Sequence, residues 1–287
     1  MANQSAVALV TGASRGAGRG IAIALGSHGC TVYITGRSEK KGDHPLPGTI
    51  YETAEAVTQA GGKGIAVRCD HADDGQVAEL FEQIREEQGR LDICVNNAAA
   101  IYDELTTPGN FWEKPLKLSD IINVGIRSSY VASWHAARIM VPQGSGLIAF
   151  TSASGASHYV YGPGYGTHKA GVDKMAHDMG IDLADTGVST VSIWMGALLT
   201  DRLCAMIDAE PEKYGHFRNT LETPEFTGHI LWEIFESPDR PTLNGKTVIG
   251  AEYASDKGMK DVGGKQPPSY RDTHGVWPLE QFDRIIR

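Results

Sequence analysis

The stretch Thr11-Gly12-Ala13-Ser14-Arg15-Gly16-Ala17-Gly18 follows a short apolar run and opens a segment with helical periodicity. Glycines let the backbone turn sharply and approach a pyrophosphate, and a helix N-terminus offers free N–H groups and a positive dipole end. The spacing is Gly-x3-Gly-x-Gly, not the common G-x-G-x-x-G. A glycine cluster alone predicts only a tight turn. At the first strand-to-helix turn, this one predicts a dinucleotide site formed by Gly12, Ser14, Arg15, Gly16, Ala17 and Gly18.

Outward from this turn, apolar β-branched runs alternate with segments in which apolar residues return every three or four positions. The predicted strands are 6–11, 31–35, 64–68, 93–96, 146–151, 188–194 and 247–249. The predicted helices are 19–28, 50–60, 76–88, 118–140, 165–185 and 224–236. This alternation predicts an α/β fold: a single-domain, Rossmann-type, doubly wound parallel sheet of about seven strands, with helices on both faces and the ligand at the carboxyl ends of the strands.

Three stretches lie outside this alternation. Residues 38–49 form a polar loop that is longer than usual for a strand-to-helix connection. Residues 197–223 mix apolar residues with Pro and Gly, and we interpret them as a lid segment. Residues 254–287 show no clear period. We therefore divide the chain into a domain at 1–253 and a C-terminal extension at 254–287.

The composition is that of an ordinary globular protein, with 41% hydrophobic and 21% charged residues among 287. A formal net charge of −9 argues against a nucleic-acid or anionic-membrane surface. The N-terminus lacks the basic region of a signal peptide, and no apolar run approaches the ~18 residues needed to span a bilayer. We expect a cytoplasmic protein. We also expect no metal, because no metal-ligand spacing occurs among Cys30, Cys69, Cys94 and Cys204.

The end of the second predicted strand indicates which dinucleotide binds. In Tyr33-Ile34-Thr35-Gly36-Arg37 there is no acid to accept hydrogen bonds from the ribose hydroxyls of NAD. Arg37 and the glycine-loop residue Arg15 instead suit a 2′-phosphate, which takes bidentate bonds from guanidinium groups. The alternative is that both arginines are merely solvated. We predict NADP(H) over NAD(H).

Two further residues follow the third and fourth predicted strands. Asp70 is placed to accept a hydrogen bond from the adenine amino group, although Asp also favours loop starts and caps. Asn97 lies where a side-chain amide can contact the cofactor or tie strands together. We predict that both belong to the cofactor site, and for Asn97 the structural role stays equally open.

Tyr165 and Lys169 lie four residues apart on one face of a predicted helix. A free phenol has a pKa near 10, and an adjacent cation lowers it by stabilising the phenolate. Ser152, at the end of the fifth predicted strand, can donate to a substrate carbonyl, and Ser154 is its rival for this role. Asn123 is a polar residue within an apolar helical stretch that passes beside the site, where a buried amide needs a partner.

These motifs, in this order and spacing over roughly residues 5–250, resemble the short-chain dehydrogenase/reductase (SDR) family. The resemblance implies a catalytic tetrad: Tyr165 transfers a proton, Ser152 holds the carbonyl, Lys169 binds the nicotinamide ribose, and Asn123 positions a relay water. It also implies that Tyr165, Lys169 and Thr200 contact the cofactor. Several shorter stretches, including Phe111-Trp112-Glu113, resemble the dehydrogenase/reductase member-one group, which is associated with carbonyl reduction.

The function predicted from the sequence is hydride transfer between NADP(H) and a small-molecule carbonyl or secondary alcohol, by an oxidoreductase that forms a homodimer or homotetramer. The alternative is a non-catalytic NADP-binding regulator or scaffold with the same fold. Departures from the family pattern are Ala99, His168 and Met195, which stand where glycine, serine and proline are usual. His158, Tyr159 and Tyr161 face the substrate pocket or pack at a subunit interface.

Overall fold

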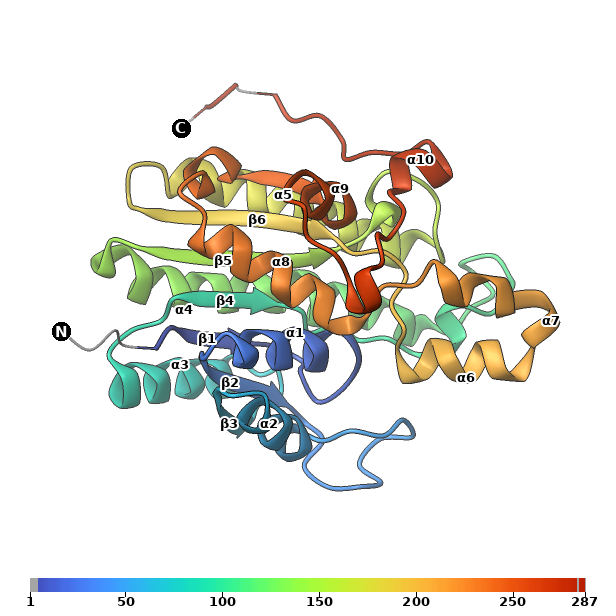
Figure 1. Ribbon diagram of the computed structural model, residues 1–287, viewed down its shortest axis with the longest axis horizontal. Helices are drawn as coiled ribbons and strands as arrows, with labels where there is room; N and C mark the ends of the chain where they lie inside the picture. The colour runs from blue at the N-terminus through green and yellow to red at the C-terminus, as the bar shows by residue number, and fades with distance from the viewer. Residues whose placement is uncertain (1–4, 283, 287) are drawn as a thin grey trace.

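The structure is a computed structural model that describes residues 5–282 and 284–286, without the side chains of residues 213, 217 and 219. One sheet contains seven parallel strands in the order β3-β2-β1-β4-β5-β6-β7. Their bounds are β1 Val7–Val10, β2 Thr31–Gly36, β3 Lys63–Arg68, β4 Ile93–Asn96, β5 Gly146–Ser152, β6 Val188–Trp194 and β7 Lys246–Ile249. The predicted doubly wound parallel sheet is confirmed (Figure 1).

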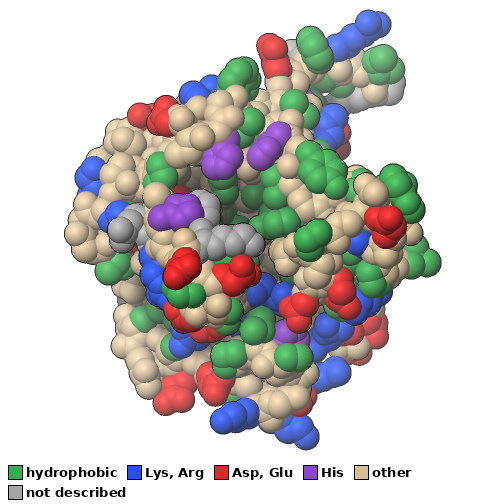
Figure 2. Space-filling view, turned by 90° about the vertical axis from the view of Figure 1, so that its right-hand side faces the viewer, with side chains coloured by type: hydrophobic (Ala, Val, Ile, Leu, Met, Phe, Trp, Pro, Cys, Tyr) green, Lys and Arg blue, Asp and Glu red, His purple; other side chains and the backbone are tan. Residues whose placement is uncertain are grey.

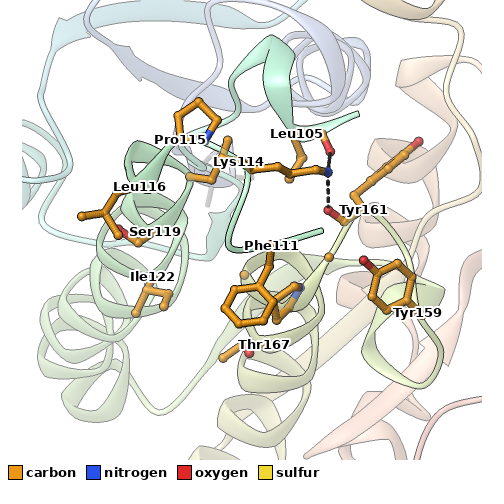
Figure 3. A pocket seen from close by; sticks show the side chains of 14 residues that line it. Leu105, Phe111, Lys114, Pro115, Leu116, Ser119, Ile122, Tyr159, Tyr161 and Thr167 are labelled. Carbon is orange, nitrogen blue, oxygen red and sulfur yellow. Dashed lines mark hydrogen bonds between the residues drawn. The ribbon is translucent and has the colours of Figure 1, made fainter. Parts of the chain in front are cut away.

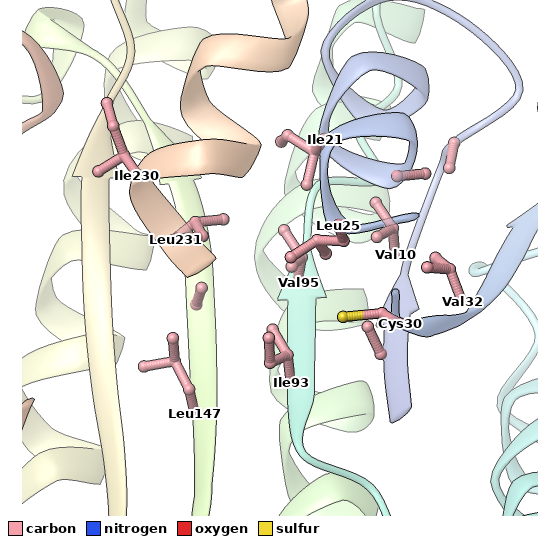
Figure 4. Packing of buried hydrophobic residues seen from close by; sticks show 14 of the residues in the cluster. Val10, Ile21, Leu25, Cys30, Val32, Ile93, Val95, Leu147, Ile230 and Leu231 are labelled. Carbon is pink, nitrogen blue, oxygen red and sulfur yellow. The ribbon is translucent and has the colours of Figure 1, made fainter. Parts of the chain in front are cut away.

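Helices cover both faces of the sheet. Helices α1 (Gly16–Ser27), α2 (Ile50–Gln59) and α8 (Pro224–Glu236) pack on one face, and α3 (Asp74–Gln88), α4 (Ser128–Gln143) and α5 (Pro163–Asp182) on the other. In Figure 4, Ile21 and Leu25 of α1 lie over the sheet beside Val95, and Ile230 and Leu231 of α8 lie over the strands to the left of Val95. Successive β5 residues alternate between the two cores, as the pleat of a strand requires.

The strand order places the ligand site. From β1 the chain continues to β2 and β3 on one side, then crosses to β4 on the other side of β1, and β5, β6 and β7 extend the sheet in that opposite direction. In open α/β sheets such a switch point leaves a crevice at the carboxyl ends of the strands, and ligands bind there. This edge is the right-hand side of Figure 1, where the glycine loop, α6 (Asp201–Ala209) and α7 (Pro211–Tyr214) also lie.

The predicted continuous helix 118–140 is wrong. The segment Ile122–Arg127 forms wide π-helical turns, with Val124 and Gly125 outside helical geometry, before α4 begins at Ser128. Gly125 has φ +158°, and a Cβ there would lie 3.1 Å from the His168 ring. The backbone N–H of Ala100 donates to the Val124 carbonyl at 2.8 Å. The helix is interrupted by contacts with α5 and with the loop that follows β4. Local sequence propensity does not cause the break, so the apolar periodicity of the sequence continues through it.

The segments outside the alternation are anchored to one another. Within 197–223, Leu198 pairs with Glu222 and closes the base of the segment that contains α6 and α7. Near the C-terminus, α9 (Gly250–Asp256) is followed by α10 (Tyr270–His274). The Asp261 carboxylate accepts bonds from Thr223 N at 2.8 Å and from Thr223 Oγ1 at 2.5 Å. The C-terminal segment therefore holds the end of the 197–223 segment in place.

Two features are absent from the part of the chain that the structure describes. None of the helices described in the structure is long and apolar enough to cross a membrane. No group of three or more His, Cys, Asp or Glu side chains able to hold a metal ion occurs within the same described part of the chain.

Candidate active site

The glycine loop brings the backbone close to the end of β4. Gly12 has φ +63°, and a Cβ there would lie 2.7 Å from Ala98 Cα. A Cβ on Gly18 would lie 2.5 Å from Asn97 Nδ2, which donates to the carbonyls of Thr11 at 2.9 Å and Gly12 at 3.1 Å. Only glycine fits these positions. The Asn97 side chain thus ties β4 to the glycine loop and shapes the helix N-terminus where a pyrophosphate would bind.

A groove of about 560 Å³ opens beside this loop, and we call it the glycine-loop groove. Nine residues predicted for the site line it: Gly12, Ser14, Arg15, Ala17, Gly18, Arg37, Asp70, Asn97 and Asn123. Two other predicted residues, Gly16 and Thr200, are neighbours, because a Cβ on Gly16 would lie 3.7 Å from Thr200 Cγ2. Figure 2 looks onto this edge of the molecule, where basic and histidine side chains lie among apolar ones.

Basic side chains gather at one part of the groove. Arg15, Arg37, Arg202 and His44 all line it. Burial lowers the pKa of Arg15, and the charges of Arg202 and Arg37 lower it further. Burial likewise lowers the pKa of His44, followed by the charge of Arg15. The three guanidinium groups carry positive charge that favours an anionic ligand, whereas the lowered pKa of His44 leaves its ring mostly neutral at pH 7. Arg202 and His44 were not predicted from the sequence.

The 38–49 loop is held against the groove by Arg15. The guanidinium donates from Nε to the Pro47 carbonyl at 3.0 Å, and from Nη2 to Ser38 Oγ and the Gly48 carbonyl, both at 2.8 Å. This arrangement explains how His44 reaches the groove. It also means that Arg15 has a positioning role in addition to its charge.

Asp70 lines the glycine-loop groove and makes the loop-starting contact, while its contact with adenine stays a prediction. Its carboxylate accepts from Ala72 N at 3.0 Å, which is a loop-starting role, and lies 3.7 Å from Arg37 Nη1. Next to it, the buried His71 ring lies 2.7 Å from Thr35 Oγ1, and burial lowers the pKa of His71 to about 4. His71 is therefore neutral at physiological pH and adds no charge to the groove.

Three features of the groove fit a bound dinucleotide. Close-approach glycines lie at a helix N-terminus, Asp70 faces the groove, and the basic cluster lies at the end of β2, where an NAD-binding carboxylate is absent. Gly12 to Gly18 would hold the pyrophosphate, Asp70 the adenine, and Arg15 and Arg37 a 2′-phosphate.

Beyond the groove, three side chains at four-residue intervals form a line along α5. We call Tyr165, Lys169 and Asp173 the catalytic stripe. Lys169 Nζ donates to the Thr151 carbonyl at 3.0 Å and lies 5.5 Å from the centroid of the Tyr165 ring. Burial lowers the pKa of Lys169 to about 8, although the charge of Asp173 opposes this shift. Lys169 thus stays mostly protonated at pH 7.

The expected lowering of the Tyr165 pKa is wrong for this structure. Burial raises the pKa of Tyr165 above its ordinary value, and the charges of nearby Tyr270 and Tyr161 raise it further. Lys169 directs its ammonium group at a backbone carbonyl instead of the phenol oxygen. Tyr165 is consequently protonated at neutral pH, which suits a proton donor.

Asp173 is the centre of a buried hydrogen-bond network below Lys169. Its carboxylate accepts from Ser192 Oγ at 2.5 Å and from Trp194 Nε1 at 2.8 Å, and it also has Ser152 as a hydrogen-bonding partner. Burial raises its pKa, while these donors and Lys169 lower it. Ser152 is fully buried, and its Oγ donates to the Lys169 carbonyl at 3.3 Å.

Ser154 faces a different set of side chains. Its Oγ lies 3.0 Å from His158 Nε2, and its hydroxyl is near enough to the Tyr270 phenol to oppose the rise in the pKa of Tyr270 that burial causes. The next residue, Gly155, packs directly on the Tyr165 ring, since a Cβ there would lie 2.7 Å from Cε1. Ser154 therefore lies beside the phenol that is expected to transfer a proton.

Asn123 lies just before the break in the π-helical segment. Its side chain is exposed and lines the glycine-loop groove, so the expectation of a buried amide is wrong. The physical reason is the break at Val124 and Gly125, which turns this part of the chain toward the groove. An exposed amide at this position has access to water.

A separate apolar cavity of about 270 Å³ lies between the 105–119 loop and the start of α5. Figure 3 shows Phe111, Ile122 and Tyr159 around it, with Lys114 Nζ donating to the Leu105 carbonyl. Thr167 also lines this cavity. Tyr165 is not among the lining residues, but Tyr161, which does line the cavity, packs edge-on against the Tyr165 ring with centroids 5.3 Å apart.

Comparisons with known proteins agree with this geometry. A family model described as short chain dehydrogenase matches residues 6–210. The mouse protein dehydrogenase/reductase SDR family member 1 is 38% identical over 92% of this chain and 85% of its own length, and the human protein of that name is 38% identical over 94% and 87%. A crystal structure of a short chain dehydrogenase from Mycobacterium thermoresistibile has a TM-score of 0.76 at 24% identity, covering 92% of each chain.

Proposed function

Because the chain belongs to the short-chain dehydrogenase family, whose members are oxidoreductases that bind a nicotinamide cofactor, we propose that it is an NADP(H)-dependent carbonyl reductase. The observation that carries the proposal is the position of the catalytic stripe. Tyr165 and Lys169 lie on α5 at the same sheet edge as the glycine-loop groove, within reach of one bound ligand.

The proposed roles follow from the contacts. When bound, NADPH supplies a hydride to the carbonyl carbon. Tyr165, which burial keeps protonated, donates its proton to the carbonyl oxygen as negative charge develops there. The Lys169 ammonium stabilises the phenolate that results, and it binds the nicotinamide ribose. A serine hydroxyl at the end of β5 donates to the same oxygen, and Ser152 and Ser154 are the two candidates. Asn123 holds a water that returns a proton to Tyr165.

The preference for NADP(H) rests on the basic cluster. Arg37 is 68% exposed and its contact with Asp70 is long, so its guanidinium is available to a phosphate. No carboxylate from the end of β2 competes for the ribose hydroxyls. Isothermal titration with NADPH and NADH checks this: we expect NADPH to bind at least tenfold more tightly. Equal affinities would remove the argument for a phosphate site.

The 197–223 segment is proposed as a lid over the substrate. Its base is closed by the Leu198–Glu222 pair, and Thr200 begins α6 by accepting a bond from Leu203 N at 3.3 Å. Thr200 thereby brings the start of the lid next to Gly16 of the glycine loop. We place the substrate between this segment, Tyr165 and the residues around Ser154, with 254–287 as an extension of the 1–253 domain.

Activity of the purified protein tests the proposal. We expect NADPH to be oxidised in the presence of members of a broad panel of aldehydes and ketones, including aromatic, alicyclic and steroid ketones. If NADPH binds but no panel member supports its oxidation, the chain is a non-catalytic NADP-binding regulator or scaffold. If neither cofactor binds, the chain is neither an NADP(H)-dependent carbonyl reductase nor an NADP-binding regulator or scaffold.

We also propose that the chain forms a homodimer or homotetramer through α4 and α5. Tyr130 and Trp134 of α4 are 56% and 49% exposed, and the Arg138 guanidinium covers one face of the Trp134 indole at 4.6 Å. Aromatic and Arg side chains of this kind are enriched at protein interfaces. Analytical ultracentrifugation of wild type and Trp134→Ala measures it. A monomeric wild type would contradict the proposal.

A further inference from the structure

Glu222 lies where the 197–223 segment returns to the sheet, and it is only 1% exposed. Three hydrogen bonds connect it to the other end of that segment. Its backbone N donates to the Ala197 carbonyl, and its own carbonyl accepts from Leu199 N, both at 2.8 Å. Its carboxylate accepts from Gly196 N through Oε2 at 2.9 Å. Glu222 therefore joins the two ends of the segment with its main chain and with its side chain.

The carboxylate of Glu222 lies directly against the backbone that it holds. A Cβ on Gly196 would lie 2.5 Å from Oε1 and 2.7 Å from Cδ of Glu222, so any side chain at that position would displace the acid. Oε1 has no hydrogen-bond partner among the described residues. A buried polar atom without a partner costs stability. The stability of the fold alone therefore does not explain an acid at this position.

The C-terminal segment holds the residues on both sides of Glu222. Lys265 Nζ donates to the Leu221 carbonyl, and the Asp261 carboxylate accepts from Thr223 N at 2.8 Å and from Thr223 Oγ1 at 2.5 Å. Asp261 N in turn donates to the Lys265 carbonyl at 2.8 Å, so both anchors belong to one turn of the chain. The position of Glu222 consequently depends on residues beyond 253.

The backbone held in this way, residues 195–200, leads from the end of β5 to the glycine loop. Met195 N donates to the Ser152 carbonyl at 3.2 Å. At the other end Thr200 begins α6, and its Cγ2 would lie 3.7 Å from a Cβ on Gly16. The segment thus connects the predicted catalytic serine with the loop that would hold the pyrophosphate. The nicotinamide half of the cofactor would lie between these two parts of the site.

We propose that Glu222 is a positioning residue for the cofactor: by accepting the hydrogen bond of Gly196 N, it holds residues 195–200 in the conformation that receives the nicotinamide half of NADP(H). This inference rests on the proposed function and adds to it a residue that touches neither cofactor nor substrate. Glu222 acts through the backbone next to it and through Thr200. The C-terminal segment contributes to the cofactor site by fixing Glu222.

The adenosine half of the cofactor should not depend on Glu222. The side chains proposed to bind the 2′-phosphate and the adenine, those of Arg15, Arg37 and Asp70, come from the glycine loop and from the residues that follow β2 and β3. Loss of the hydrogen bond to Gly196 should therefore weaken binding of the whole cofactor and leave binding of its adenosine part intact. A residue that only stabilised the fold would show no such difference between the two parts.

Two variants of similar size test the role of the acceptor. Glu222→Gln keeps an oxygen that accepts from Gly196 N, whereas Glu222→Met fills the same space without one. By isothermal titration, we expect Glu222→Met to raise the Kd of NADPH about tenfold and to leave the Kd of adenosine 2′,5′-bisphosphate, which lacks the nicotinamide, within about twofold. Glu222→Gln is expected to bind both ligands like the wild type. Glu225→Gln, in the first turn of α8, is the control and should also bind both like the wild type.

Three results would overturn the proposal. A folded Glu222→Met that binds NADPH as tightly as the wild type would show that the hydrogen bond to Gly196 does not position the segment. Equal losses of affinity for NADPH and for the bisphosphate would show that Glu222 only supports the fold. A Glu222→Gln variant that binds NADPH as weakly as Glu222→Met would show that the acceptor oxygen is not what matters.

Thr223→Val provides the test if Glu222→Met does not fold. It removes the side-chain bond to Asp261 and leaves the side chain of Glu222 unchanged. We expect the Kd of NADPH to rise about threefold, again without a change in the Kd of the bisphosphate. An unchanged Kd of NADPH would overturn the proposal that the C-terminal segment acts on the cofactor site through Glu222.

The measurements also separate this inference from the proposed function. If the wild type binds neither NADPH nor NADH, both fail. If it binds NADPH but oxidises none with any carbonyl compound, the proposed function fails, and the comparison of the Glu222 variants still decides the inference. If the wild type is active and the Glu222 variants all bind NADPH equally well, only the inference fails.

Discussion

The glycine-loop groove and the catalytic stripe lie at the same edge of the sheet, but water reaches them very differently. The Arg37 side chain in the groove is 68% exposed, whereas Lys169 and Asp173 in the stripe are 7% and 6% exposed. An exposed ion pair adds little to stability, so Arg37 is available to bind a phosphate, whereas Arg15 also holds the 38–49 loop. In the stripe, burial shifts the pKa of every member. Substitution of Arg37 should therefore change binding alone, and substitutions in the stripe should change activity, pH dependence and stability together.

Removing the buried cation should have the largest effect. Lys169→Met is expected to lower kcat by about 100- to 10,000-fold, because the phenolate of Tyr165 loses its counter-charge. The same variant should be more stable than wild type at pH 7. Each pKa unit represents about 1.36 kcal/mol, so the fall in the pKa of Lys169 from its ordinary value to about 8 corresponds to roughly 3 kcal/mol.

The stability gain should depend on pH. Because the folded pKa of Lys169 is below the unfolded value, wild-type stability falls as the pH drops through 8 and is recovered above the unfolded pKa. The difference between Lys169→Met and wild type should accordingly shrink toward pH 10. Lys174→Met, on the exposed side of α5, is the control and should leave kcat unchanged. A destabilised Lys169→Met at pH 7 would contradict the account of the stripe.

Removing an exposed cation should change binding only. Arg37→Ala is expected to raise the Kd of NADPH roughly 10- to 100-fold, from the ~1.5–3 kcal/mol of hydrogen bonds to a charged group, and to leave the Kd of NADH within about twofold. The melting temperature should not change. Arg68→Ala is the matched control, since Arg68 pairs with Glu39 at 3.4 Å and is not among the residues that line the groove. An equal loss of NADPH and NADH affinity would show that Arg37 does not contact the 2′-phosphate.

Asp173→Asn should move the pH profile of the reaction. The negative charge of Asp173 raises the pKa of Lys169, so its removal lowers that pKa further below 8. The alkaline limb of kcat against pH is expected to shift to lower pH, with a loss of about tenfold in kcat at pH 8. Asp178→Asn on the exposed side of α5 is the control. If the limb does not move while the melting temperature falls, Asp173 supports the fold and does not influence Lys169.

Glu222→Gln gives the smallest expected effect and concerns a buried acid outside both regions. Oε2 of Glu222 accepts from Gly196 N at 2.9 Å, and Oε1 has no hydrogen-bond partner among the described residues. Burial raises the pKa of Glu222 to about 7, so its stabilising contribution is complete below pH 4.5 and is lost as the pH rises through 7. Melting curves should show the variant gaining roughly 1 kcal/mol on wild type between pH 5 and pH 6. A constant difference would contradict the shifted pKa.

The sequence predicts the strands and helices well because burial in a doubly wound sheet leaves a clear pattern. Short parallel strands buried on both faces are apolar runs, and helices on the faces keep a period near 3.6. The break at Val124 and Gly125 was not predicted because the apolar period continues through it. Only the packing of the His168 ring on Gly125 reveals it.

The site is predictable where its residues lie on regular elements. Tyr165 and Lys169 have a helical spacing, and Asp173 continues the spacing by one more turn, so the third member of the stripe was available from the sequence. The sequence did not predict that Arg202, His44 and Tyr270 would lie at the site. They reach the site from the lid, the 38–49 loop and the C-terminal segment, whose paths depend on tertiary contacts such as those of Arg15 with Pro47 and Gly48.

The most direct test of the central claim is to measure NADPH binding and NADPH oxidation with a carbonyl substrate on the same preparation of Tyr165→Phe. The account predicts a Kd for NADPH within about threefold of wild type and a kcat lower by about 1,000-fold, because the phenyl ring keeps its packing on Gly155 while the proton is lost. A folded Tyr165→Phe that binds NADPH and reduces the substrate at the wild-type rate would contradict it.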